Sequence, residues 1–265
     1  MGKVRIRGIE VAYEEAGSGT PVVLLHGFPF NRSMWSEQIA DLAARHRVIA
    51  PDLRGHGESS VTDSPATMEE MAKDVSELME KLDISRAAIC GLSMGGYVAL
   101  ALYRMFPLRA RALALIDTRA SADSEEGRAN RESQAQNALA EGMATIADVM
   151  LPKLFSPKTV ARKAPVVSRV REMILGNKSE GAAAALRGMA MRRDQTPLLS
   201  RVVAPALIVV GRDDAITPVA DSELMHREIG GSRLAIIEEA GHLSNLEQPK
   251  QFNEILGKFL RDLEV

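Results

Sequence analysis

The 265-residue sequence contains a single cysteine, Cys90, so an intramolecular disulfide framework is excluded. Cys90 lies in an apolar run, where we expect a buried small hydrophobic residue rather than a reactive thiol. Charge of one sign is not in excess either, because 33 Lys and Arg residues face 35 Asp and Glu residues, for a formal net charge of -2. This balance gives no reason to expect nucleic acid or an acidic membrane surface as a partner.

Long hydrophobic runs are also missing. No uninterrupted apolar segment is long enough to span a bilayer, and residues 1–7 alternate charged and apolar side chains without the apolar stretch of a secretory signal. We therefore expect a cytoplasmic protein that is not attached to a membrane. His56 has no second histidine at helical spacing, so we predict no metal site, and no motif calls for a cofactor.

Two kinds of apolar segment alternate along the first 120 residues, after an antiparallel pair of short strands predicted over residues 4–13. Runs without internal alternation are typical of strands buried on both faces, and they cover residues 21–25, 47–51, 86–90 and 112–116. Segments with helical periodicity stand between them, at residues 33–44, 67–82 and 94–106. This alternation predicts a mostly parallel sheet with right-handed crossovers.

The alternation stops between residues 121 and 200, where helix-forming residues interrupted by prolines predict an insertion of short helices. We expect residues 1–120 and 201–265 to form the core and residues 121–200 a helical cap. The cap's methionines fit the adaptable packing of a lid over an apolar cleft, although ordinary helical core explains any single one better. Four charged residues near the end of this segment are expected to form a solvated surface: Arg187, Arg192, Arg193 and Asp194. Alternatively, one of them binds an acidic group of the substrate.

The stretch Gly91-Leu92-Ser93-Met94-Gly95 lies between a predicted strand and a predicted helix. A side chain on so sharp a turn is held in a strained backbone conformation, and the flanking glycines let the strand and helix approach without a Cβ clash. We predict that the Ser93 hydroxyl protrudes from this turn. The Met94 amide opens the helix, so it faces any negative charge that develops beside the serine oxygen. The alternative is a glycine-rich turn with a solvated serine.

Polar residues also follow two later strands. Asp213 and Asp214 come directly after the apolar run at 205–211, and His242 follows the last predicted strand. Ligands of such sheets bind beyond the carboxyl ends of the strands, so we expect these side chains to lie near Ser93. The loop at residues 52–60 holds acids, an arginine and a histidine as well, but there we favour a structural role over a catalytic one.

Through four segments the whole chain resembles the α/β-hydrolases, and within them the small bacterial carboxylesterases, enol-lactonases and cofactor-free haloperoxidases. The segments are His26-Gly27-Phe28-Pro29, residues 51–59, residues 91–96 and residues 240–249. The resemblance implies an α/β-hydrolase fold, with a mostly parallel sheet of about eight strands, flanking helices and a helical cap inserted after the sixth strand.

The resemblance also implies roles for three side chains: Ser93 is the nucleophile, His242 the general base and then acid, and Asp214 the carboxylate that orients the imidazole. Asp214 is preferred to Asp213 because the family pattern Gly-x-x-Asp-x-x-x-Pro begins at Gly211 and includes Asp214.

The same resemblance implies that the backbone amides of Phe28 and Met94 form an oxyanion hole. Gly27, Phe28, Met94 and Leu243 are the residues expected to line the substrate pocket.

These expectations describe an enzyme that cleaves carboxylic esters of short acyl chains through an acyl-enzyme, with a small-molecule ester as partner and no cofactor. Serine at position 93 argues against dehalogenases and epoxide hydrolases, whose similar turn carries an aspartate nucleophile. A lactonase is the alternative, with perhydrolase chemistry as a side activity when peroxide is supplied. A non-catalytic binding protein on the same fold would tolerate loss of Ser93, His242 or Asp214, and all three are present.

Overall fold

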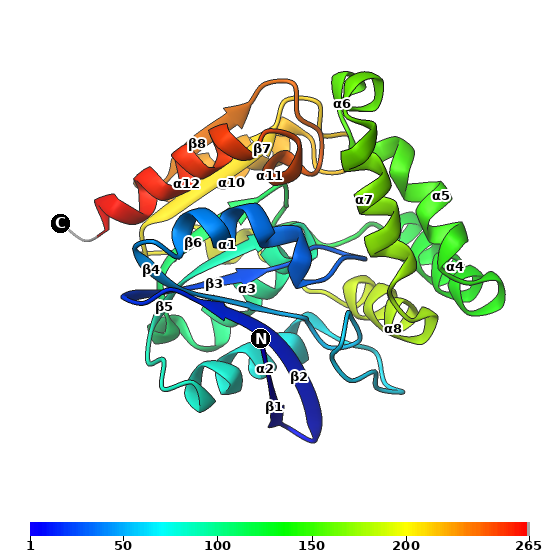
Figure 1. Ribbon diagram of the computed structural model, residues 1–265, viewed down its shortest axis with the longest axis horizontal. Coiled ribbons are helices and arrows are strands. Elements are labelled where there is room, and N and C mark those ends of the chain that lie inside the picture. The colour runs from blue at the N-terminus through cyan, green and yellow to red at the C-terminus, as the bar shows by residue number, and fades with distance from the viewer. Residues whose placement is uncertain (264–265) are drawn as a thin grey trace.

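The computed structural model describes residues 1–263, and one eight-stranded sheet forms its centre (Figure 1). The strands lie in the order β1-β2-β4-β3-β5-β6-β7-β8. β2 is antiparallel to both β1 and β4, and all other neighbours are parallel. This confirms the predicted mostly parallel sheet. The strands are β1 (Gly2–Ile6), β2 (Ile9–Ala16), β3 (Thr20–Leu25), β4 (His46–Pro51), β5 (Ala87–Leu92), β6 (Ala110–Ile116), β7 (Ala206–Gly211) and β8 (Arg233–Ile237).

Helices cover both faces of the sheet because the order of the strands reverses once. The chain passes from β3 to β4 in one direction and from β4 to β5 and β6 in the other, so right-handed crossovers place the connecting helices on opposite faces. α1 (Ser36–Leu42) packs with the last helix, α12 (Pro249–Asp262), on one face. α2 (Met68–Lys81) packs with α3 (Met94–Met105) on the other face, where α10 (Val219–Glu228) connects β7 to β8.

Two helix starts have identifiable local causes. The Thr67 side chain accepts a hydrogen bond from Glu70 N (3.2 Å), so Thr67 is the N-cap residue at which α2 begins. The helix expected over residues 33–44 begins instead as a 3-10 turn at Arg32–Trp35, where the Asn31 side chain accepts from Ser33 N (3.0 Å).

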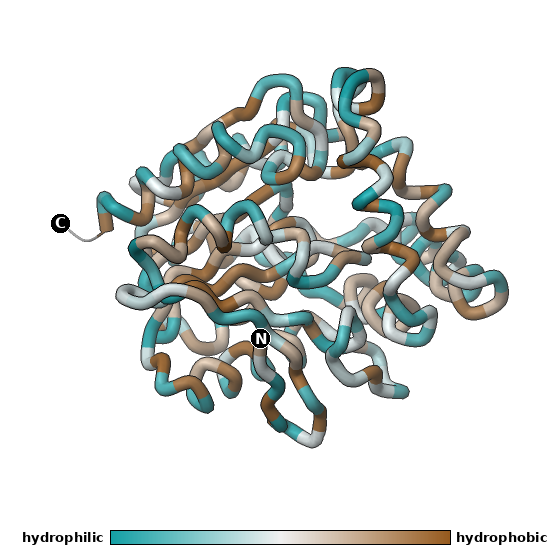
Figure 2. Tube along the Cα trace, viewed as in Figure 1, coloured by the Kyte–Doolittle hydropathy of each residue, from teal (hydrophilic) through white to brown (hydrophobic). Residues whose placement is uncertain are grey.

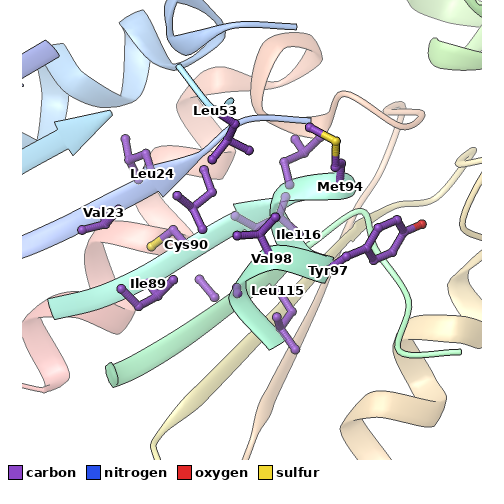
Figure 3. Packing of buried hydrophobic residues seen from close by; sticks show 14 of the residues in the cluster. Val23, Leu24, Leu53, Ile89, Cys90, Met94, Tyr97, Val98, Leu115 and Ile116 are labelled. Carbon is purple, nitrogen blue, oxygen red and sulfur yellow. The ribbon is translucent and has the colours of Figure 1, made fainter. Parts of the chain in front are cut away.

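The central strands supply most of the apolar core around the turn that carries Ser93. Side chains of β3, β5 and β6 are buried almost without alternation, as predicted, and Figure 3 shows Val23, Ile89 and Leu115 among them. In Figure 2 hydrophobic residues follow these strands while hydrophilic residues dominate the outer turns of the helices. Cys90 is fully buried in this cluster, and burial raises the pKa of its thiol to about 12. The thiol is therefore a packing group.

Between β6 and β7 the chain forms a layer of helices beside one end of the sheet (Figure 1). α4 packs along α8, and α5 packs against α7 and α4. The Ser124 side chain caps the start of α4, and Gly142, with φ 87°, separates α4 from α5 in a conformation that a side chain would strain. The helices are α4 (Glu125–Glu141), α5 (Met143–Leu154), α6 (Pro157–Arg162), α7 (Ala164–Leu175), α8 (Ser179–Ala190) and α9 (Thr196–Leu199).

The charged residues of the polar loop at residues 52–60 hold it in place through hydrogen bonds and ion pairs, including pairs with residues outside the loop. Asp52 is fully buried and accepts hydrogen bonds from Arg32 N and from Glu58 N, both at 2.8 Å, as well as pairing with the Arg32 guanidinium. Arg54 makes a bidentate pair with Asp74 of α2, with both N–H···O distances at 2.8 Å. These contacts agree with the structural interpretation of the loop.

Candidate active site

Ser93 stands on the turn between β5 and α3 with φ 52° and ψ -113°, a backbone conformation that residues other than glycine rarely adopt. The flanking glycines are required by close approach. A Cβ on Gly91 would lie 2.2 Å from Gly95 O, and a Cβ on Gly95 would lie 2.2 Å from Leu25 O. Ser93 N also donates to Ile116 O (2.9 Å), so β6 helps to hold the strained turn.

A continuous chain of hydrogen bonds joins Ser93 to the two residues predicted to lie beside it. His242 Nδ1 lies 2.8 Å from Asp214 Oδ2, and His242 Nε2 lies 2.9 Å from Ser93 Oγ. An ionised carboxylate only accepts hydrogen bonds, so Nδ1 carries the proton and donates. In the neutral imidazole Nε2 is then the acceptor, and Ser93 Oγ donates to it. The structure thus brings together three residues that are far apart in the sequence.

The network around Asp214 decides between the two neighbouring acids. Asp214 Oδ1 accepts from Ile216 N (2.8 Å) and Thr217 N (2.9 Å), and Thr217 Oγ1 donates to Oδ2 (2.7 Å). Asp214 is only 5% exposed, whereas Asp213 is exposed to solvent. The carboxylate that faces the imidazole is therefore Asp214, as the spacing of the motif implied.

Burial and charge act against each other at this pair. Burial alone would lower the pKa of His242, but attraction and hydrogen bonding by the Asp214 carboxylate raise that pKa above its ordinary value. For Asp214, burial favours the neutral form, yet the imidazole and Thr217 hold its pKa below the usual range. Asp214 is thus kept ionised in a site from which water is largely excluded.

A second buried carboxylate, Asp117, stands at the end of β6 behind this pair. Its side chain accepts from Gly211 N (2.8 Å) and from the Ser244 hydroxyl (2.6 Å), so it links β6 to β7 and to the loop after His242. Burial, and then repulsion from Asp214, raise the pKa of Asp117 to about 8. Sequence reasoning gave Asp117 no role, and the available signal was only its position directly after an apolar run.

Two backbone amides near Ser93 have no acceptor. Leu25 of β3 is in register with Gly91 of β5, which places the loop after β3 beside the Ser93 turn. Within residues 1–263 the amides of Phe28 and Met94 donate no hydrogen bond. Met94 is the first residue of α3, so its N–H has no intrahelical acceptor. The two N–H groups could therefore receive an anionic oxygen.

A cavity of about 450 Å³ opens between these loops and the helices of the 121–200 segment. Ser93, Asp214 and His242 do not line it themselves, but two lining residues adjoin them: Phe28 carries one of the unpaired amides, and Ile216 N donates to Asp214. Its lining includes apolar and cationic side chains from the loops and from α4, α5 and α8: Phe28, Arg119, Arg131, Lys153, Leu186 and Ile216.

Comparison with known proteins identifies the family to which this arrangement belongs. A family model described as the α/β hydrolase fold matches residues 20–249. The chain belongs to the α/β-hydrolase family. This confirms the family that the sequence motifs implied.

Solved α/β-hydrolases resemble the chain over its whole length. A thermophilic esterase from Thermogutta terrifontis, with malate bound, is 42% identical, covers 100% of both chains and superposes with a TM-score of 0.98. The enol-lactonase from Burkholderia xenovorans LB400 is 31% identical over 98% of this chain and 100% of that chain, with a TM-score of 0.92. A curated relative, 3-oxoadipate enol-lactonase 2 from Acinetobacter baylyi, is 32% identical over 84% of this chain and 82% of its own length.

In this α/β-hydrolase the loop that carries His242 is tied to the end of α5. His242 N donates to Leu154 O (2.9 Å). The Glu247 carboxylate, at the end of α11 (Ser244–Glu247), accepts from Gly241 N (2.7 Å) and from Ser156 N (2.8 Å). Glu247 is fully buried, so the hydrogen bonds from these two amides replace those that its carboxylate would make with water. Sequence reasoning did not predict this connection, and the only available signal was a polar residue shortly after His242.

The residues expected to line the pocket lie at different depths. Phe28 borders the cavity, whereas the Met94 and Leu243 side chains are fully buried in the core cluster. Gly27 sits against Leu92 and is not part of the cavity wall. The cavity of this hydrolase is instead built largely from α4, α5, α8 and the segment after β6.

The expected solvated surface around residues 187–194 needs one correction. Arg187 and Arg193 are partly or largely exposed, but Arg192 is buried, pairs with Asp123 (2.6 Å) and lies 4.3 Å from the centre of the Tyr97 ring. Its partners stand far from it in the sequence, on the segment after β6 and on α3, and local sequence pattern carries no information about them.

Residues 1–263 contain no group of three or more His, Cys, Asp or Glu side chains arranged to hold a metal ion. In the same part of the chain, no helix combines the length and apolar character that crossing a membrane requires.

Proposed function

We propose that this α/β-hydrolase is a serine hydrolase that cleaves carboxylic esters. Ser93 is the nucleophile, His242 the general base, and Asp214 the group that orients and charges the imidazole. The observation that carries the proposal is the unbroken hydrogen-bond chain from Asp214 through His242 to Ser93 Oγ. A serine hydroxyl is a poor nucleophile at neutral pH, so its proton must leave as it attacks, and Nε2 at 2.9 Å lies within reach of that proton.

The reaction then follows from the geometry. Ser93 Oγ attacks the ester carbonyl carbon as its proton passes to His242 Nε2, and the carbonyl oxygen becomes an oxyanion. The amides of Phe28 and Met94 receive this oxyanion, each stabilising it by about 3 kcal/mol, as in other oxyanion holes. His242 returns the proton to the leaving alkoxy oxygen, which departs as an alcohol and leaves an acyl-Ser93. A water that loses its proton to His242 then hydrolyses this intermediate.

The size of the cavity supports a small substrate. A volume of about 450 Å³ lies toward the lower end of the range for ligand pockets, so short acyl groups fit the space better than long ones. The helices of residues 121–200 form one wall of the cavity, and we propose that this segment is a cap that selects the substrate. The 42% identical esterase supports acyclic esters as the first choice.

Lactone opening is the second candidate, since two relatives of about 30% identity are enol-lactonases. The same nucleophile and amides would open a ring, with the alcohol remaining attached to the acyl product. Perhydrolysis, in which peroxide replaces water in the second step, would be a side activity of the same acyl-enzyme.

The test is a comparison of initial hydrolysis rates for p-nitrophenyl esters of increasing acyl length and for a panel of lactones. The purified protein is compared with Ser93→Ala. Fast turnover of short esters that is lost in the variant supports a serine carboxylesterase, and turnover of lactones alone supports the second candidate. Equal activity of the variant, or no activity of the wild type on either panel, would refute the proposed role of Ser93; in the second case a non-catalytic binding protein becomes the better explanation.

A further inference from the structure

We propose that the cavity contains a subsite for a carboxylate, formed by Arg119 and Lys153, and that the preferred substrates are esters or lactones that carry a second, free carboxylate. The proposal deepens the proposed function and rests on it, because it concerns the part of the substrate that does not react.

The charge of the cavity wall is the first observation. Three cations line the cavity, namely Arg119, Arg131 and Lys153, and the only acid among the lining residues is Asp123. Asp123 is already neutralised twice, by Arg131 on α4 and by the buried Arg192 at 2.6 Å. The wall is therefore positive, although the whole chain has a formal net charge of -2. A surplus of positive charge facing a cavity favours an anionic ligand.

The hydrogen bonds of Arg119 are the second observation. A guanidinium carries five N–H donors, yet within the described residues Arg119 uses one of them, from Nη2 to Ile216 O (2.6 Å). Its Nε is buried without a hydrogen-bond partner and forms only a long ion pair, at 3.9 Å, with Asp221, which does not line the cavity. The side chain is 30% exposed. Arg119 is thus a cation that is held in place at one nitrogen and retains unused donors.

Lys153, an exposed residue of α5, supplies the second cation. It lies on α5, lines the cavity, and makes no ion pair in the part of the chain that the structure describes. Arg131 differs from both, because its guanidinium is occupied by Asp123 and by the sulfur of Met189. Arg119 and Lys153 are therefore the two groups left to bind a ligand anion.

The remaining wall defines the rest of the substrate. Phe28, Leu186 and Ile216 are apolar, and two of them adjoin the reacting groups: Phe28 carries one of the unpaired amides, and Ile216 N donates to Asp214. In the proposed complex, the short aliphatic arm of an acyl group attached at Ser93 lies against these side chains, and the carboxylate at the end of that arm binds the cations. Monoesters of short dicarboxylic acids have this form.

The experiment compares two substrates that differ only in charge. Monoethyl adipate carries a carboxylate at its free end, and ethyl 6-amino-6-oxohexanoate carries an amide of the same shape. Ethanol release is measured for wild type, Lys153→Gln, Arg119→Gln and the control Arg162→Gln, which removes an exposed cap cation outside the cavity. The readout is the ratio of kcat/KM for acid over amide, so a general loss of activity through the Arg119 contact with Ile216 cancels.

We expect the wild-type ratio to lie roughly between ten and a hundred, as for hydrogen bonds to charged groups. Lys153→Gln and Arg119→Gln should each lower the ratio by about tenfold, and Arg162→Gln should keep it. A wild-type ratio of one or less, or a ratio that Lys153→Gln leaves unchanged, overturns the subsite while ester hydrolysis itself stands. If neither ester is hydrolysed and p-nitrophenyl esters and lactones are also inert, the proposed function has failed instead.

Discussion

Replacing Asp214 by asparagine should reverse the direction of the hydrogen bond between residue 214 and His242 Nδ1. The asparagine oxygen would take the place of Oδ1, which accepts from the amides of Ile216 and Thr217. Its NH2 group would then face His242 Nδ1, where the carboxylate oxygen now stands at 2.8 Å. Because NH2 only donates, the imidazole must accept at Nδ1 and carry its proton on Nε2. Nε2 could then no longer take the proton of Ser93.

The expected loss in kcat is about 10,000-fold, the size seen when the same change forces the wrong tautomer in a characterised Ser-His-Asp enzyme. That factor corresponds to about 5.4 kcal/mol of activation free energy, since each tenfold change is about 1.36 kcal/mol. Asp213→Asn is the matched control, because it makes the same chemical change one residue away at an exposed position. The assay is kcat on the best ester from the p-nitrophenyl series, with thermal unfolding to show that both variants fold.

The reasoning is refuted if folded Asp214→Asn keeps more than about a tenth of wild-type kcat, far above the loss expected from a wrong tautomer, or if Asp213→Asn loses as much. The first result would mean that another group orients His242. Asp117 would then be the candidate, because it is the other buried acid that acts electrostatically on the imidazole when it is ionised.

Three further predictions concern protonation and the buried Glu247. Since His242 must be neutral to act as a base and Asp214 raises its pKa above 6.5, kcat/KM should fall with decreasing pH along a limb centred above pH 6.5, and a limb at lower pH would contradict the assigned partner. Burial lowers the pKa of His26 to about 4 and of His56 to about 3, so between pH 6.5 and 4 the unfolded chain binds protons at these two residues that the folded chain does not. The two histidines outweigh Asp117, whose pKa of about 8 acts in the opposite direction, so the free energy of unfolding, measured by urea titration, should decrease on acidification through this window. In Glu247→Gln the side-chain NH2 faces one of the two buried amides, so the free energy of unfolding should decrease by about 1–3 kcal/mol. Glu254→Gln, at an exposed position, should change that free energy little.

The sequence predicted those parts of the site that depend on chain order within a parallel sheet. Ser93, Asp214 and His242 each follow a strand, and the carboxyl ends of parallel strands share one edge, so their meeting could be inferred without coordinates. The preference for Asp214 over Asp213 followed from motif spacing, and the structure agrees because only the former is buried beside the imidazole.

The parts that sequence reasoning missed depend on side chains brought together by packing between helices. Arg192 looked like a surface residue because its partner Asp123 is distant in the chain. The residues of the cavity wall could not be predicted for the same reason. Lys153 and Leu186 belong to different helices, and helical periodicity does not say which faces of α5 and α8 meet. Asp117 was visible as a polar residue after a strand, but its importance depends on the register of β6 against β7.

The hydrogen bonds between the end of α5 and the His242 loop limit how such proteins can be recombined. A chimaera that takes residues 121–200 from a relative would also replace Leu154 and Ser156, which engage His242 N and the Glu247 carboxylate. The foreign segment must therefore offer a carbonyl and an amide at the same two points, or the loop that carries His242 loses these hydrogen bonds. Exchange of substrate preference between relatives should be easier by altering side chains on α4, α5 and α8 than by transplanting the whole insertion.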